Sequence, residues 1–153
     1  SIDNSSFINL ESLEKISIKC PTIFIGQCCF MNCKSLSSIE FDDVIEYKIS
    51  DHAFSQCESL KDFFISSYQK AEVKDHCFSD CKNLLSVKLI SEKIMIGESC
   101  FENCSSLSKI TVLENQKVCF GSNFKHLKRA ILLLAVQKKQ SIRKRQLRPG
   151  YHS

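Results

Sequence analysis

Apolar residues recur along this chain in one pattern with a period of 23 or 24 residues. The clearest unit runs from Phe101 to Val112 and has the form F-x-x-C-x-x-L-x-x-I-x-V. Equivalent units start at Phe30, Phe54 and Phe78, and the four starting positions are 24, 24 and 23 residues apart. Degenerate copies start at Phe7 and Phe124. The pattern therefore predicts about six stacked units, with atypical ones at the two ends.

Each half of the unit predicts a different local structure. In L-x-x-I-x-V the last two apolar residues are two apart, so both point to one side of a short strand. One such strand cannot bury its inner face, whereas stacking the next unit about 4.8 Å away buries that face and forms a parallel sheet. Phe and Cys three apart fit one face of a helical or 3₁₀ turn. A further apolar pair precedes each clear unit and predicts another extended segment: Ile23 and Ile25, Tyr47 and Ile49, Ala71 and Val73, Ile94 and Ile96.

We therefore expect an α/β fold, a right-handed solenoid of leucine-rich repeat type. Short parallel strands would line its concave wall, with helical or 3₁₀ turns opposite. Residues 1–136 would form the solenoid, and residues 137–153 a basic C-terminal tail.

The repeat resembles a known family. Ile96 to Val112 is similar to the BspA-like leucine-rich repeat, whose units have the form I-G-x-x-A-F-x-x-C-x-x-L-x-x-I-x-I. Ala53 and Phe54 keep its A-F pair, whereas Cys29, Cys77 and Cys100 stand where the family has Ala. The resemblance implies a non-catalytic protein-binding module of the kind found in surface antigens and adhesins of bacteria and protists.

The ten cysteines admit three interpretations. Core packing is favoured, because Cys is a small apolar side chain that is commonly buried. Disulfides between coils are an alternative, since stacked coils bring equivalent Cα atoms within about 5 Å. A zinc site is the third, but no His stands at ligand spacing from these cysteines. We expect Cys20, Cys28 and Cys119, which lie off the main ladder, to be the more reactive thiols.

Charge divides the chain into two parts. Residues 1–124 hold 12 Lys and Arg against 17 Asp and Glu, whereas residues 125–153 hold nine basic residues and no acidic one. The tail could bind nucleic acid or an anionic membrane through its basic residues, or it could be a solvated terminus. Its candidate residues are Lys138, Lys139, Arg143, Lys144, Arg145 and Arg148.

Catalytic and cofactor motifs are missing from the sequence. It contains no nucleophile elbow, no Gly-rich phosphate loop and no H-E-x-x-H. We therefore predict no enzyme activity, no cofactor and no metal. No apolar run reaches the roughly 18 residues of a membrane span, and no signal peptide is recognisable. The compartment, cell surface or cytoplasm, stays open. Because the chain starts at Ser1 within a repeat, we expect it to be a piece of a longer protein.

A binding wall is the remaining prediction. Residues that alternate with the inward strand positions should point outward along the concave sheet: Ser38, Glu40, Asp42, Asp62, Phe64, Ser66, Ser86, Lys88, Ile90, Lys109, Thr111 and Leu113. Phe64, Ile90 and Leu113 are apolar where a solvated strand would be polar, which favours contact with a protein, such as a host or self surface protein. The alternatives are binding through the basic tail and a structural spacer in a longer repeat array.

Overall fold

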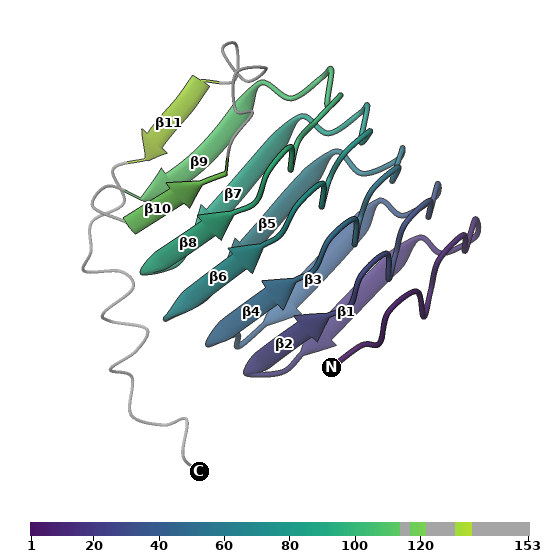
Figure 1. The fold of residues 1–153 in the computed structure, drawn as a ribbon, viewed down its shortest axis with the longest axis horizontal. Helices are drawn as coiled ribbons and strands as arrows, with labels where there is room; N and C mark the ends of the chain where they lie inside the picture. The colour runs from purple at the N-terminus through teal and green to yellow at the C-terminus, as the bar shows by residue number, and fades with distance from the viewer. Residues whose placement is uncertain (114–116, 122–130, 136–153) are drawn as a thin grey trace.

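The computed structural model describes residues 1–113, 117–121 and 131–135, and every regular element within them is a β-strand. In chain order these are β1 (Lys15–Lys19), β2 (Thr22–Ile25), β3 (Ser38–Asp42), β4 (Glu46–Ile49), β5 (Asp62–Ser66), β6 (Lys70–Val73), β7 (Ser86–Ile90), β8 (Lys93–Ile96), β9 (Lys109–Leu113), β10 (Lys117–Phe120) and β11 (Ile131–Ala135). A full coil contains one odd-numbered strand, a corner, one even-numbered strand and a turn segment (Figure 1).

The strands form two walls, and all their pairings are parallel (Figure 1). The even wall is one five-stranded sheet in the order β10-β8-β6-β4-β2. The odd wall is divided into a sheet β1-β3 and a sheet β11-β9-β7-β5. The predicted parallel solenoid is confirmed, and the additional apolar pairs form the even wall, where Ile23, Tyr47 and Ile94 are at most 3% exposed. The handedness of the solenoid and the concavity of the odd wall stay predictions.

The alternation between 23 and 24 residues arises at one corner of the coil. Only Cys20 and Pro21 connect β1 to β2, and only Ser91 and Glu92 connect β7 to β8. The same corner contains three residues, 43–45 and 67–69, in the two coils between them. Because the extra residue is accommodated outside both walls, the strands keep their register from coil to coil.

Phenylalanines form a continuous column inside the stack. The ring centroids of Phe7, Phe30, Phe54, Phe78 and Phe101 follow one another at 5.3, 5.3, 5.6 and 5.7 Å. Their planes differ by at most 8°. Such offset stacking combines apolar burial with favourable ring geometry. The column confirms that the repeat found in the sequence is a repeat in space.

Cysteines form a second interior column, which confirms core packing. Cys33, Cys57 and Cys81 are fully buried and Cys104 is 9% exposed. Each thiol donates a hydrogen bond to the carbonyl of a phenylalanine in the preceding coil, as Cys81 Sγ does to Phe54 O at 3.1 Å. All ten cysteines are free. Burial raises the pKa of the Cys57 thiol to about 12, so the column is neutral at pH 7.

The turn segments differ from the expected helical or 3₁₀ turns, because the described residues contain no helix. Residues with positive φ recur in pairs four apart, such as His52 (57°) with Gln56 (61°) and His76 (55°) with Asp80 (59°). These left-handed positions interrupt any helix. They turn backbone N–H groups toward the next coil, and Phe54 N donates to Cys77 O at 2.9 Å. The coils are therefore joined by a third ladder of backbone hydrogen bonds.

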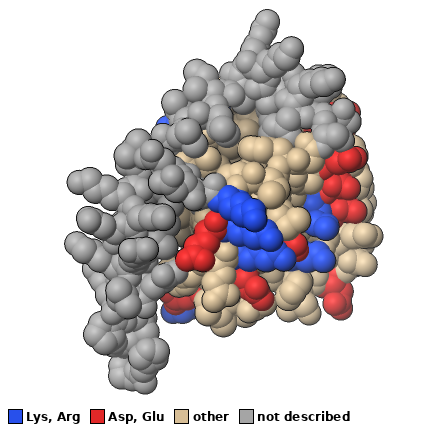
Figure 2. All heavy atoms as spheres, turned by 60° about the vertical axis from the view of Figure 1, so that its left-hand side comes forward, with Lys and Arg blue, Asp and Glu red and all other residues tan. Residues whose placement is uncertain are grey.

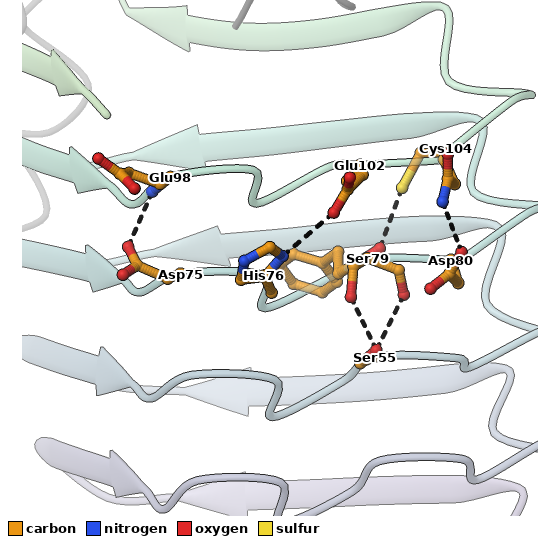
Figure 3. Close-up of polar contacts among 10 residues, drawn as sticks. Ser55, Asp75, His76, Ser79, Asp80, Glu98, Glu102 and Cys104 are labelled. Atoms are coloured by element: carbon orange, nitrogen blue, oxygen red, sulfur yellow. Dashed lines mark hydrogen bonds and ion pairs between the residues drawn. The ribbon is translucent and has the colours of Figure 1, made fainter. Parts of the chain in front are cut away.

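Polar side chains reinforce this third ladder (Figure 3). The carboxylate of Asp75 accepts the backbone N–H of Glu98 at 2.8 Å. The hydroxyls of Ser55 and Ser79, both buried, share a hydrogen bond of 2.8 Å. His76 Nδ1 lies 3.2 Å from a carboxylate oxygen of Glu102. Each contact joins successive coils, so the turn side stabilises the stack as the sheets do.

The predicted domain division at residue 136 is not tested. The chain from 136 onward, with the six candidate tail residues Lys138, Lys139, Arg143, Lys144, Arg145 and Arg148, lies outside the described residues.

Candidate functional site

The outer side of the odd wall carries most of the residues that the sequence predicts for binding. Along β5, Asp62 and Phe64 point outward, whereas Phe63 and Ile65 are buried. Nine of the predicted residues are exposed or half-buried: Ser38, Glu40, Asp42, Asp62, Phe64, Ser66, Ser86, Lys88 and Lys109. The alternation between the two sides of each strand therefore holds over most of this face.

Two of the predicted residues, Ile90 and Thr111, are buried and offer a partner little surface. Ile90, the last residue of β7, is 6% exposed. It is not a member of the apolar core cluster that contains Val87 and Leu89, so it is buried without joining the interior columns. Thr111 is also 6% exposed, and its alternation with the buried Ile110 and Val112 keeps it on the outer side of β9. The side chain of Leu113 lies outside the described part of the structure.

Most charged residues on this outer face have a partner in a neighbouring coil. Lys15 Nζ lies 3.0 Å from a carboxylate oxygen of Glu40. The hydroxyl of Ser86 donates to a carboxylate oxygen of Asp62 at 2.6 Å. Exposed pairs of this kind contribute little to stability, about 0 to 1 kcal/mol each. They do leave the face with little unbalanced charge.

The odd wall is interrupted beside Phe64. β5 is the edge of its sheet and forms no ladder with β3, although the two strands lie side by side (Figure 1). At the interruption the ring of Phe41 stands edge-on to Phe63, with 6.2 Å between centroids, and Phe41 is only half-buried. The exposed Phe64 therefore lies on the strand that borders this interruption.

Phe64 is the most exposed large apolar residue on the described odd wall, at 50%. The ammonium of Lys88 lies 5.4 Å from its ring centroid, within the range of a cation–π contact. Asp62 and Ser66 flank it along β5. The arrangement is an aromatic side chain within a polar rim, which is how energetically important residues are placed in many protein interfaces.

A second charged face was missed in the sequence analysis. In the even wall, Lys70, Lys93 and Lys117 are aligned in register on β6, β8 and β10. The signal was present, since these lysines are 23 and 24 residues apart. It was not used because only the strands of the odd wall were considered as a binding surface.

The three thiols that the sequence predicts to be more reactive lie nearer the surface than the other seven. Cys20 and Cys28 are half-buried and Cys119 is exposed. Within residues 1–113 and 117–121 no group of three or more His, Cys, Asp and Glu side chains is placed to hold a metal ion. No helix among the described residues is long and apolar enough to cross a membrane.

Parallel coils with an interior of stacked, repeated apolar columns define a leucine-rich repeat solenoid. The family pattern described as BspA type Leucine rich repeat region (6 copies) matches residues 1–129. The chain therefore belongs to the BspA type leucine-rich repeat family, which confirms the resemblance seen in its sequence. Repeats of this kind are protein-interaction modules and typically non-catalytic.

A leucine-rich repeat protein of T. pallidum (TpLRR) has a solved structure similar to this chain. The two share 27% sequence identity with a TM-score of 0.51. The similarity covers 94% of this chain and 75% of that one. No curated protein matches the chain.

Proposed function

We propose that this chain is a non-catalytic module that binds a protein partner through the outer side of its odd wall, with Phe64 as the central contact. The observation that carries the proposal is the 50% exposure of Phe64 among outward residues that are otherwise polar. Burying a half-exposed aromatic ring on binding yields a large apolar contribution from one residue.

The rest of the face contributes specificity and limits the cost of binding. The strands are held in register by parallel ladders, so the face is preformed and loses little conformational entropy on docking. A partner that presents an apolar pocket with polar groups around it would match Phe64 and the residues that flank it along β5.

We further propose that the module belongs to a surface antigen or adhesin and that its partner is a host or self surface protein. The family supports this setting, because BspA-like repeats resemble those of bacterial and protist surface proteins.

The experiment compares two exposed phenylalanines on opposite walls. A photo-reactive amino acid replaces Phe64 in one variant and Phe24, which is 47% exposed on the even wall, in the matched control. Cross-linking to surface proteins should yield adducts specific to position 64. The captured protein is then purified, and its Kd for the unmodified chain is measured.

We expect Phe64→Ala to weaken that Kd by at least about tenfold, which corresponds to about 1.4 kcal/mol. Phe24→Ala should leave it unchanged. Equal binding by the Phe64→Ala variant, or capture at position 24 alone, would show that the odd wall is not the interface.

A further inference from the structure

The even wall carries three lysines in a single column. Lys70, Lys93 and Lys117 are the first residues of β6, β8 and β10, and the parallel ladders place them directly beside one another. Adjacent strands lie about 4.8 Å apart, so the three Cα atoms span about 10 Å. Lys93 and Lys117 are exposed, and the Lys70 side chain is 42% exposed. Figure 2 shows a band of adjacent lysines with acidic side chains around it.

This column is not explained by folding. Like charges directly opposite one another on neighbouring strands repel and destabilise a sheet. The equivalent column of the odd wall avoids the problem, because its residues alternate in character: Lys15, Ser38, Asp62, Ser86 and Lys109. A polar or acidic residue at one of the three positions would have lowered the repulsion in the even wall. All three positions nevertheless carry lysine.

Among the described residues, carboxylates pair with only one end of the column. Glu72 accepts a hydrogen bond from Lys70 at 3.0 Å and is 15% exposed. Burial raises the pKa of Glu72, but the bond from Lys70 and the charges of Lys70, Lys74 and Lys48 outweigh burial and hold that pKa below its usual value. Glu46 lies beside Lys70 in the same column, and Glu92 precedes Lys93 at the corner. Within the described residues no carboxylate oxygen lies within 4.0 Å of Lys93 or Lys117 Nζ.

The column next to the lysines offers apolar contact. Met95 and Cys119 lie in register on β8 and β10, one row away from Lys93 and Lys117. The same column carries Glu72 beside Lys70. Lys93 and Lys117 therefore have apolar neighbours, whereas Lys70 has a carboxylate.

The spacing of the row fits one kind of ligand. Acidic side chains at i and i+4 of a helix are about 5 to 6 Å apart, close to the distance between strands. Residues i to i+7 of a helix span about 10 Å, which is the length of the lysine row. A single-stranded nucleic acid would need aromatic stacking platforms. Of the exposed aromatic residues in this sheet, Phe24 of β2 lies three strands from Lys93, and Phe120 of β10 alternates with Cys119 onto the other side of its strand.

We propose that the outer face of β6, β8 and β10 binds an acidic amphipathic helix of a protein partner. Carboxylates at i, i+4 and i+7 pair with Lys70, Lys93 and Lys117, and the apolar side chains of the helix contact Met95. This surface is on the opposite wall from Phe64 and is independent of the function proposed above.

The test uses two synthetic helical peptides of equal composition. One carries Glu at i, i+4 and i+7 beside a leucine stripe, and the other carries the same residues in scrambled order. Fluorescence anisotropy measures binding of each to the full chain in about 20 mM and about 150 mM NaCl. We expect the patterned peptide to bind at least about tenfold more tightly than the scrambled one, and more weakly at the higher salt concentration because exposed ion pairs are screened.

Two triple variants then locate the interaction. Replacing Lys70, Lys93 and Lys117 by Glu should abolish binding of the patterned peptide, whereas replacing Lys15, Lys19 and Lys109 on the odd wall by Glu should not. Circular dichroism verifies that both variants fold. The single change Lys93→Gln, at the centre of the row, should weaken binding of the patterned peptide about threefold. It replaces the triple variant as the test if the triple variant does not fold.

Three outcomes would overturn the proposal. If both peptides bind equally, or if both triple variants lose peptide binding to the same extent, net charge alone attracts the peptides to the chain. Tighter binding of an oligonucleotide of the same charge, lost in the same variant, would assign the row to nucleic acid.

Discussion

The interior and the exterior of the coils repeat in different ways. Inside, every column stays apolar, and the one nearest the turns keeps a single residue type in the stacked rings of Phe30, Phe54 and Phe78. Outside, the residue changes from coil to coil, as from Asp62 to Lys109 on the odd wall. Interior neighbours must match in shape because they are in direct contact, whereas an outer side chain is constrained only by solvent and by partners.

This difference indicates where function is to be sought. Uniformity inside is sufficiently explained by packing, so the Phe and Cys columns need no further role. Uniformity outside has no packing explanation, and the even wall shows it in Lys70, Lys93 and Lys117. A single apolar residue among polar ones on the outer side, such as Phe64, is the second feature that indicates a binding surface.

The strongest test of the comparison uses two phenylalanines of the same coil. Phe54→Ala removes a fully buried ring that stacks on both neighbours and should lower the free energy of unfolding by about 3 to 5 kcal/mol. Phe64→Ala removes an exposed ring and should change it by less than about 0.5 kcal/mol. Urea unfolding followed by circular dichroism measures both. Similar losses at the two positions would break the distinction between inside and outside.

Alkaline pH tests the cysteine column. Burial raises the pKa of Cys57 from 9.0 to about 12 and that of Cys104 to about 12, so between these values the unfolded chain holds fewer protons than the folded one. The contribution of these buried thiols to the free energy of unfolding is fully present below about pH 9. It then falls by about 1.4 kcal/mol per pH unit for each such thiol as pH rises toward 12.

Urea unfolding in reductant at pH 7, 9, 10 and 11 measures this slope. Cys57→Ala should make it shallower by about one thiol, whereas Phe64→Ala, which removes no titrating group, should leave it unchanged. If Cys57→Ala leaves the slope unchanged, the Cys57 thiol is not neutral in the folded chain.

Gly97 tests a position at which the residue type changes between coils, although the backbones there lie close together. A Cβ on Gly97 would lie 2.5 Å from the backbone N of Asp75 in the preceding coil, so the two backbones would have to separate. Ser50 occupies the same place two coils earlier and carries a Cβ. Gly97→Ala should lower the free energy of unfolding by about 1 to 3 kcal/mol. Ser50→Ala, the control, should change it by less than about 0.5 kcal/mol, and thermal unfolding compares the two.

The smallest expected effect is a gain in stability. Tyr47 is 2% exposed in the even wall, and its hydroxyl has no hydrogen-bond partner among the described side chains. Tyr47→Phe keeps the ring and removes the unpaired hydroxyl, so it should raise the free energy of unfolding by about 1 kcal/mol. A loss of stability in urea unfolding would show that the hydroxyl is satisfied in solution.

The sequence determined the repeat, its two classes of apolar segment and the burial of Cys33, Cys57, Cys81 and Cys104. These follow from periodicity alone, because residues one period apart must meet when the coils stack. The corner where the period changes from 23 to 24 residues could also have been located by counting residues from each Phe to the second apolar segment of its coil.

Other features arose only in the tertiary structure. The turns at His52 and His76 use left-handed residues rather than helix, because alternate N–H groups, including those of His52 and His76, bond to the next coil and only the others bond within the segment. Ile90 and Thr111 are buried although strand alternation places both on the outer side, because alternation alone does not show which side chains are covered. The interruption between β3 and β5 likewise depends on how neighbouring coils fit. Periodicity specifies which residues are neighbours, and the geometry of each contact decides the direction in which they point.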